Sequence, residues 1–180
     1  LPSISEFAGS VSDGVRSIIV GGQASPAFQN SMSTCLIASK ADTTDWGNLS
    51  AAKSGLEGAE DRTRGVFGGG TNPTKQNVIE YITFASAGDV TDFGDLSAAR
   101  DRLGACSNVH GGLVAIDPDP RFSYIQGSGR AVFMSGEKSS PYYTNVEDFI
   151  SIPTLGNAAD FGDTPVSSYG GAGCSSSTRG

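Results

Sequence analysis

The chain contains few of the residues on which catalysis and covalent cross-linking most often depend. Its 180 residues include three cysteines and one histidine, His110, and only 17% of them are charged. Three cysteines do not make a disulfide framework. One histidine cannot supply the imidazole ligands of a copper site. The composition therefore predicts free thiols and argues against histidine-based chemistry.

Long apolar runs and an excess of positive charge are also missing. No apolar stretch approaches the roughly 18 residues that a membrane-spanning helix needs, and the N-terminus lacks the basic start and apolar core of a signal peptide. The net charge is −7, which disfavours attraction to nucleic acids and anionic membranes. We therefore expect no nucleic-acid partner and no membrane insertion.

What the chain has in abundance is internal repetition. The segment TDWGNLS at 44–50 returns as TDFGDLS at 91–97 and as ADFGDTP at 159–165. Flanking blocks keep the same order, and they divide the chain into a part-unit 1–17, repeats 18–64 and 65–111, an insertion 112–129 and a repeat 130–180. Periods of this length are typical of arrays in which each repeat is one supersecondary unit. We expect a single repeat domain spanning residues 1–180.

Each unit reads as a small antiparallel sheet, which predicts an all-β fold. The 25 glycines and the Pro, Asn and Asp residues bound apolar runs of strand length, such as 78–84. Helical spacing occurs only at 49–56 and 96–103, as one turn at most. The aromatic residue and the leucine of the repeated block have the size to fill the space between sheets. Cys35 falls at the position of Ile82 and Ile150 and is expected to be buried.

Loops that vary between units are the expected contact regions, because a scaffold carries its recognition residues on loops. The loops 23–29, 71–76 and 137–144 are equivalent by the repeat, which predicts that they share one rim. The insertion reads as a hairpin in which 113–116 and 122–125 flank a Pro-rich turn, and it either extends a sheet or projects as an interaction element. The candidate contact residues are Phe28, Lys75, Lys138, Tyr142 and Tyr143 on the loops, and Phe122 and Tyr124 in the insertion.

The repeated acids are better explained by turns than by a metal site. Asp92 with Asp95, and Asp160 with Asp163, raise the possibility of calcium. In the first unit, however, the second acid is replaced by Asn48, and Asp or Asn beside Gly is ordinary turn chemistry. His110 similarly falls where other units have threonine, and no glycine cluster has phosphate-loop spacing. We predict no catalytic residue, no metal and no cofactor.

The order of features resembles the Kelch repeat, in which a strand ends in Gly-Gly and a later aromatic residue precedes a leucine by three positions. Trp46 with Leu49 and Phe93 with Leu96 match that pattern, while the third unit has Phe161 with Thr164. The repeats are most similar to Kelch-like repeats in virion proteins of tailed phages, especially marine and cyanobacterial ones. The resemblance implies a β-propeller with about three four-stranded blades. Because propellers typically have four to eight blades, it implies part of a larger or multi-chain ring. A β-trefoil is the main alternative, and a β-prism is a weaker one.

The same resemblance implies a function. It suggests a non-enzymatic structural or binding module of a phage tail, fibre or capsid-attached protein, located in the virion. Its partners would be other virion chains, further copies of itself or a host-surface glycan. Two alternatives are a carbohydrate-active or oxidative propeller enzyme and a cellular Kelch-type protein-interaction adaptor.

Overall fold

The structure is a computed structural model that describes residues 6–39, 41–108, 129–139 and 143–173. The described residues form strands and turns and contain no helix, so the all-β prediction is confirmed. The strands are β1 Gly9–Ser12, β2 Arg16–Val20, β3 Gln23–Ala24, β4 Ala27–Phe28, β5 Ser31–Leu36, β6 Thr44–Asn48, β7 Ser54–Glu60, β8 Arg64–Asn72, β9 Thr74–Lys75, β10 Val78–Thr83, β11 Thr91–Asp95, β12 Gly104–Ser107, β13 Arg130–Met134, β14 Thr144–Ser151 and β15 Ala159–Ser168.

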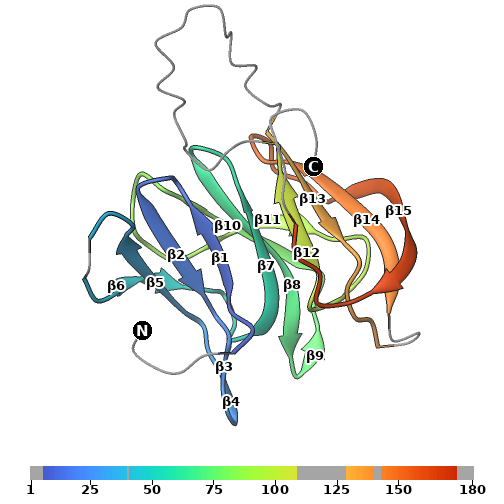
Figure 1. The fold of residues 1–180 in the computed structure, drawn as a ribbon, viewed down its shortest axis with the longest axis horizontal. Helices are drawn as coiled ribbons and strands as arrows, with labels where there is room; N and C mark the ends of the chain where they lie inside the picture. Colours follow the sequence, from blue (N-terminus) through green and yellow to red (C-terminus); the bar gives the residue numbers. More distant parts are fainter. Residues whose placement is uncertain (1–5, 40, 109–128, 140–142, 174–180) are drawn as a thin grey trace, which may run out of the picture.

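Three antiparallel sheets follow one another along the chain. The first sheet has the order β1-β2-β5-β6, the second β7-β8-β10-β11 with the short β9 beside β8, and the third β12-β13-β14-β15. A small hairpin, β3-β4, extends from the first sheet (Figure 1). The leading strands lie side by side, since β1 contacts β7 and β7 contacts β12. The sheets therefore stand face to face, with their first strands along a common edge.

The sheets are offset by one strand from the sequence repeats. β7 belongs to the repeat 18–64, yet it pairs with β8, which opens the repeat 65–111. In the same way the part-unit 1–17 supplies β1 to the first sheet. Each sheet thus takes its first strand from the preceding unit, and this exchange ties neighbouring units together.

A repeated β-bulge explains the Asp-aromatic-Gly block. In the second sheet Ile79 pairs with Gly94, and the next residue, Glu80, pairs with Asp92, so Phe93 is left out of the ladder. The first and third sheets show the same shift at the equivalent positions. A bulge re-aims the side chain of the extra residue. Here it directs an aromatic ring out of the sheet.

Two hydrophobic cores fill the spaces between the sheets. Trp46 and Leu49 of the first unit are buried with Leu56 and Phe67 of the second sheet. The second core repeats this arrangement between the second and third sheets, with the following buried members: Ala59, Val66, Ile79, Phe93, Leu96, Leu103, Ala105, Ala131, Phe133, Ile150 and Ile152. The predicted role of the aromatic residue and the leucine as fillers between sheets is confirmed for the first two units.

Each inter-sheet space also encloses an ion pair. Lys53 Nζ lies 2.5 Å from a carboxylate oxygen of Glu80, and Arg100 Nη2 lies 2.9 Å from Asp148 Oδ2. All four side chains are almost fully buried. Because a buried charge is costly unless it is paired, each of these acids depends on its cation.

The prediction for Cys35 is wrong. Its side chain is only partly buried, although Ile82 and Ile150 at the equivalent positions are both buried. Those two isoleucines face the preceding sheet. Cys35 is on the first sheet, which has no preceding sheet within the described part of the chain, so the same position remains open.

Candidate binding surface at one rim

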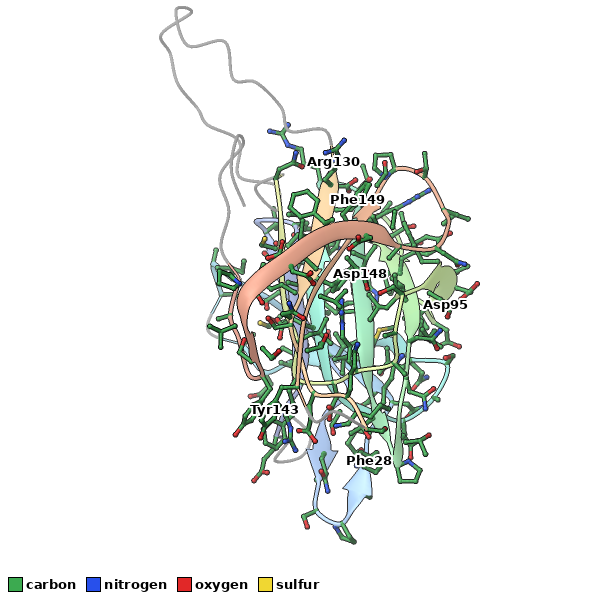
Figure 2. All side chains as sticks on the ribbon, turned by 90° about the vertical axis from the view of Figure 1, so that its right-hand side faces the viewer. Phe28, Asp95, Arg130, Tyr143, Asp148 and Phe149 are labelled. Atoms are coloured by element: carbon green, nitrogen blue, oxygen red, sulfur yellow. The ribbon has the colours of Figure 1, made fainter. Side chains whose placement is uncertain are left out.

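The equivalent loops lie at one end of the sheets. β3-β4 and the β8-β9 turn extend toward the same end in Figure 1. Figure 2 shows Phe28 and Tyr143 near that end, whereas Arg130 lies near the opposite one. We call the end that carries Phe28, β9 and Tyr143 the rim. The Ser25-Pro26 peptide bond within the β3-β4 turn is cis.

The predicted contact residues differ in how accessible they are. Phe28 and Lys138 are partly buried, while Tyr143 keeps 44% of its surface exposed. Tyr142, Phe122, Tyr124 and the predicted insertion hairpin, apart from Gly129, lie outside the described residues. Of the described candidates, Tyr143 is therefore the side chain best placed to meet a partner.

Lys75 takes part in a charge cluster within the rim. Its ammonium group pairs with Asp101 and lies 3.0 Å from Glu137 Oε1. The other carboxylate oxygen of Glu137 lies 2.9 Å from Arg102 Nη1. The second and third sheets are thereby joined at the rim. Lys75 thus has a structural role, and a partner would meet the edge of this cluster at Arg102.

Tyr143 stacks on a second tyrosine that the repeat gave no reason to select. The rings of Tyr143 and Tyr169 have centroids 4.7 Å apart and are inclined by 9°. Tyr169 is 50% exposed. It directly follows β15, which is longer than its counterparts in the other sheets. The departure of residues 165–169 from the repeat was the one sequence signal that pointed there.

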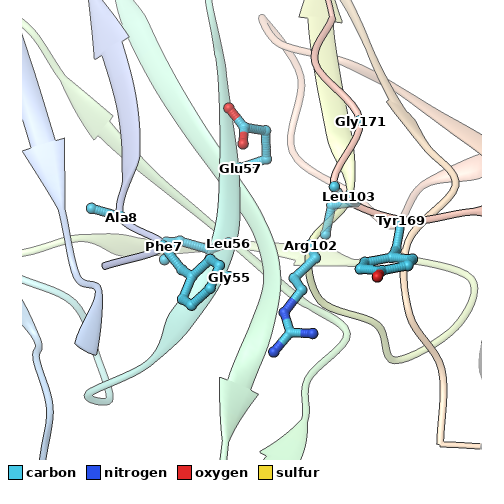
Figure 3. A pocket seen from close by; sticks show the side chains of 10 residues that line it. Phe7, Ala8, Gly55, Leu56, Glu57, Arg102, Leu103, Tyr169 and Gly171 are labelled. Atoms are coloured by element: carbon cyan, nitrogen blue, oxygen red, sulfur yellow. The ribbon is translucent and has the colours of Figure 1, made fainter. Parts of the chain in front are cut away.

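A pocket of about 450 Å³ opens beside this tyrosine pair. Phe7, Arg102 and Tyr169 supply its large side chains, and Glu57 supplies a carboxylate (Figure 3). The Arg102 guanidinium lies 5.2 Å from the centre of the Phe7 ring. The volume is within the range of small-ligand sites.

The pocket lies where the leading strands begin, at a repeated backbone position. Phe7, Gly55, Arg102 and Gly170 all have φ between 51° and 68°. Backbone hydrogen bonds link these residues in a chain. The amide of Gly55 donates to the carbonyl of Phe7, the amide of Arg102 to the carbonyl of Gly55, and the amide of Gly170 to the carbonyl of Arg102. A positive φ suits glycine and strains other residues by about 1–3 kcal/mol. Phe7 and Arg102 carry that strain, and both side chains line the pocket.

Burial weakens the acidity of the two carboxyl groups on β7. It raises the pKa of Glu57, and a hydrogen bond from the Gly58 amide partly offsets that rise. It also raises the pKa of Glu60 from its usual 4.5 to about 7. The negative charge of Glu60 therefore depends on pH close to neutrality.

The shift at Glu60 predicts a pH-dependent stability. Because its pKa is higher in the folded state, the folded chain holds the proton more tightly, and stability falls as the pH rises from about 4.5 to about 7. We expect Glu60→Gln to raise the free energy of unfolding by roughly 2 kcal/mol at pH 8 and to change it little at pH 4. Urea unfolding at the two pH values measures this. An equal effect at both would show that Glu60 does not titrate as inferred.

Comparison with known proteins adds no family to these observations. No protein-family model matches the chain, and no curated protein matches it. Within the described residues, no helix is long and apolar enough to cross a membrane. Over those same ranges, no three His, Cys, Asp or Glu side chains come together as a possible metal site.

The pocket has the composition of a binding site. Its lining combines two aromatic rings, a guanidinium and one carboxylate with glycine and aliphatic surface. Aromatic faces provide apolar contact at low entropic cost, and polar groups at their edges fix orientation. Hydrolysis by paired carboxylates requires a second acid opposite the first, and Glu57 is the only carboxylate among the lining residues.

Proposed function

We propose that the chain is a non-enzymatic binding module of a tailed-phage particle, built from Kelch-like propeller blades that hold a recognition rim rigid. The three consecutive sheets, each with a path of four strands, support the blade arrangement. Among the described residues no strand of one sheet pairs with a strand of another, which favours blades over a β-trefoil. The assignment to a virion rests on the similarity of the repeats to those of phage virion proteins.

The single observation that carries the binding role is the tyrosine stack beside the pocket. Tyr143 and Tyr169 are both substantially exposed, although each is large and apolar. Arg102 stands in the same pocket in a strained conformation, and strain of this kind is often kept at functional sites. Flat aromatic faces beside a guanidinium and a carboxylate suit a sugar ring, so we favour a host-surface glycan as the ligand.

Arg102→Gly separates binding from folding. Glycine relieves the positive φ at this position while removing the guanidinium, so we expect the free energy of unfolding to stay within about 1 kcal/mol of the parent value. We expect both Arg102→Gly and Tyr169→Ala to bind an array of bacterial surface polysaccharides at least about tenfold more weakly than the parent chain. Leu155→Ala, which changes an exposed residue outside the pocket, is the control.

Two results would contradict the proposal. If the parent chain bound other virion proteins but no glycan, the glycan role would be wrong and the chain would be a particle-assembly module. Release of new reducing ends from a bound polysaccharide would favour the propeller-enzyme alternative. Mass spectrometry of purified particles, with the chain present at a fixed copy number, tests the virion assignment separately.

A further inference from the structure

The two internal junctions between sheets use the same contacts at equivalent positions. Arg16, which opens β2, donates from Nη2 to the carbonyl of Phe84 in the second sheet at 2.7 Å. Arg64, which opens β8, donates from Nη1 to the carbonyl of Ile152 in the third sheet at 3.0 Å. In both cases the arginine also lies over an aromatic ring of its own sheet. The junction is therefore a repeated interface with a defined donor side and acceptor side.

The last strand of each sheet completes the junction. The carbonyl of Trp46 accepts from the Gly88 amide at 2.8 Å, and that of Phe93 accepts from the Gly156 amide at 3.0 Å. The loops that contain Gly88 and Gly156 also accept a second backbone hydrogen bond. The amide of Asn48 donates to the Asp89 side chain, and the amide of Asp95 donates to the Asn157 side chain. Trp46 and Phe93, which are 47 residues apart, thus perform the same task, and so do Gly88 and Gly156, which are 68 residues apart.

The third sheet presents the same donor side with nothing over it in the described structure. Arg130 opens β13, lies over the ring of Phe149 like its counterparts, and is exposed. Phe161 is 53% exposed, whereas Trp46 and Phe93 at its position are 4% and 3% exposed. The nearest heavy atom to a Cβ placed on Gly162 would be 3.9 Å away.

The first sheet presents the matching acceptor side. Ile37 is 57% exposed, whereas Phe84 and Ile152 at the equivalent position are 3% and 0% exposed. In the loop that follows Ile37, Asp42 has the repeat position of Asp89 and Asn157, whose side chains accept hydrogen bonds from backbone amides of the neighbouring sheet. The two ends of the array are therefore complementary halves of the junction that is made twice inside it.

A coordinated change in the buried charges identifies which sheet fits the third one. Ser168 stands at the repeat position of Lys53 and Arg100, so the donor side has no cation there. Pro165, which lacks an amide hydrogen, stands where two serine amides donate to the buried acids. On the acceptor side of the first sheet, Ser33 replaces the acid itself. A sheet with Asp or Glu at the position of Ser33 would bury an unpaired carboxylate against the third sheet. The first sheet has a serine there and would bury no charge.

We infer that the outer face of the third sheet binds the outer face of the first sheet of a second copy of this chain. An interface between two different faces forms a ring when the rotation closes and a filament when it does not. Two copies would bring six sheets together, each with a path of four strands, within the four to eight blades typical of propellers. We expect the two copies to close into such a ring and not to continue as a filament. The inference does not depend on the glycan proposal, because Phe161 and Ile37, which mark the two faces, do not line the pocket, although docking would displace Gly171 from its lining.

One segment has to give way when the second copy docks. Gly171 and Gly173 lie against Gly104 and Ala105 of β12, where a fourth leading strand would run. The arriving copy brings β1 to the same place. A variant that ends at Tyr169 removes this competition and should self-associate at least as tightly as the full chain.

Charge substitutions on the two faces test the inference. We expect sedimentation equilibrium of the full chain to give the mass of two copies. Phe161→Asp and Ile37→Asp, on opposite faces, should each weaken self-association about 30-fold or more. An equimolar mixture of the two variants should form a heterodimer through the one interface that both leave intact. Leu155→Asp, which changes an equally exposed apolar residue off both faces, should remain dimeric.

Several outcomes would overturn the inference. They are a parent chain that stays monomeric, association that both single variants retain, a mixture of the variants that fails to associate, and filaments longer than two copies. The circular dichroism of each variant, matched to the parent, shows that the fold is intact. Binding of the array glycan by a monomeric variant would show that the rim works without the ring, so the two proposals can fail separately.

Discussion

Replacing Arg100 with alanine is expected to lower the free energy of unfolding by about 3–5 kcal/mol, because it leaves a buried carboxylate without its counter-ion. Arg100 is fully buried and donates to Asp148 Oδ2 at 2.9 Å and to the carbonyls of Phe133 and Val146 at 3.2 Å each. Asp148 is equally buried and also accepts the Ser97 amide. Urea-induced unfolding followed by circular dichroism gives the loss.

A double variant tests whether the loss comes from the orphaned charge. In Arg100→Met with Asp148→Asn the carboxylate is gone, and the amide oxygen can still accept from Ser97. Neutralising both members of a buried pair is far less costly than removing one. We expect the double variant to be at least about 1 kcal/mol more stable than Arg100→Met alone, which fills the same volume but leaves the carboxylate unpaired. If both lose the same free energy, packing rather than charge determines the contribution of Arg100.

Gly94→Ala is the second substitution with a large expected effect. Gly94 has φ of 149°, and a Cβ there would lie 2.4 Å from the carbonyl oxygen of Gly156 in the third sheet. We expect a loss of about 1–3 kcal/mol from the backbone conformation and a similar further loss from forcing the two sheets apart. Thermal or urea unfolding of the single variant measures the sum.

Gly162→Ala is the matched control for this steric argument. Gly162 also has φ of 149°, but a Cβ there would meet nothing closer than 3.9 Å within one copy. In the Phe161→Asp background, where the chain is expected to be monomeric, Gly162→Ala should show the conformational loss alone. Equal losses for the two glycines would mean that the close approach of neighbouring sheets does not determine the effect.

Much of the architecture could be predicted from the repeat. The aromatic residue and the leucine of the repeated block were predicted to fill the space between sheets, and Trp46 and Phe93 are buried there. Glycine follows the aromatic residue because the next sheet approaches too closely for a side chain there. When the three repeats are aligned with one another, this appears as a glycine directly after the aromatic residue in each. The offset between sheets and repeats could not be predicted, since a periodic sequence does not specify where one structural unit begins.

The parts of the site that escaped prediction depend on contacts between units. Tyr169 meets Tyr143 because β15 runs on beyond the length of its counterparts. Lys75 is held by Asp101 and Glu137, which belong to other loops. Cys35 was expected to be buried because its repeat position is buried elsewhere, but burial at that position requires a preceding sheet. Local sequence determines which side chain stands at a position, and the neighbouring sheet determines what it meets.

Each sheet is joined to the last strand of the one before it, and hydrogen exchange tests this junction most directly. The amides of Gly88 and Gly156 belong to exposed loops, yet they donate to Trp46 and Phe93 across the junctions. We expect both amides to exchange as slowly as those of the central strands β8 and β10. Exchange at the rate of a free loop would contradict the face-to-face array on which the binding and assembly proposals depend.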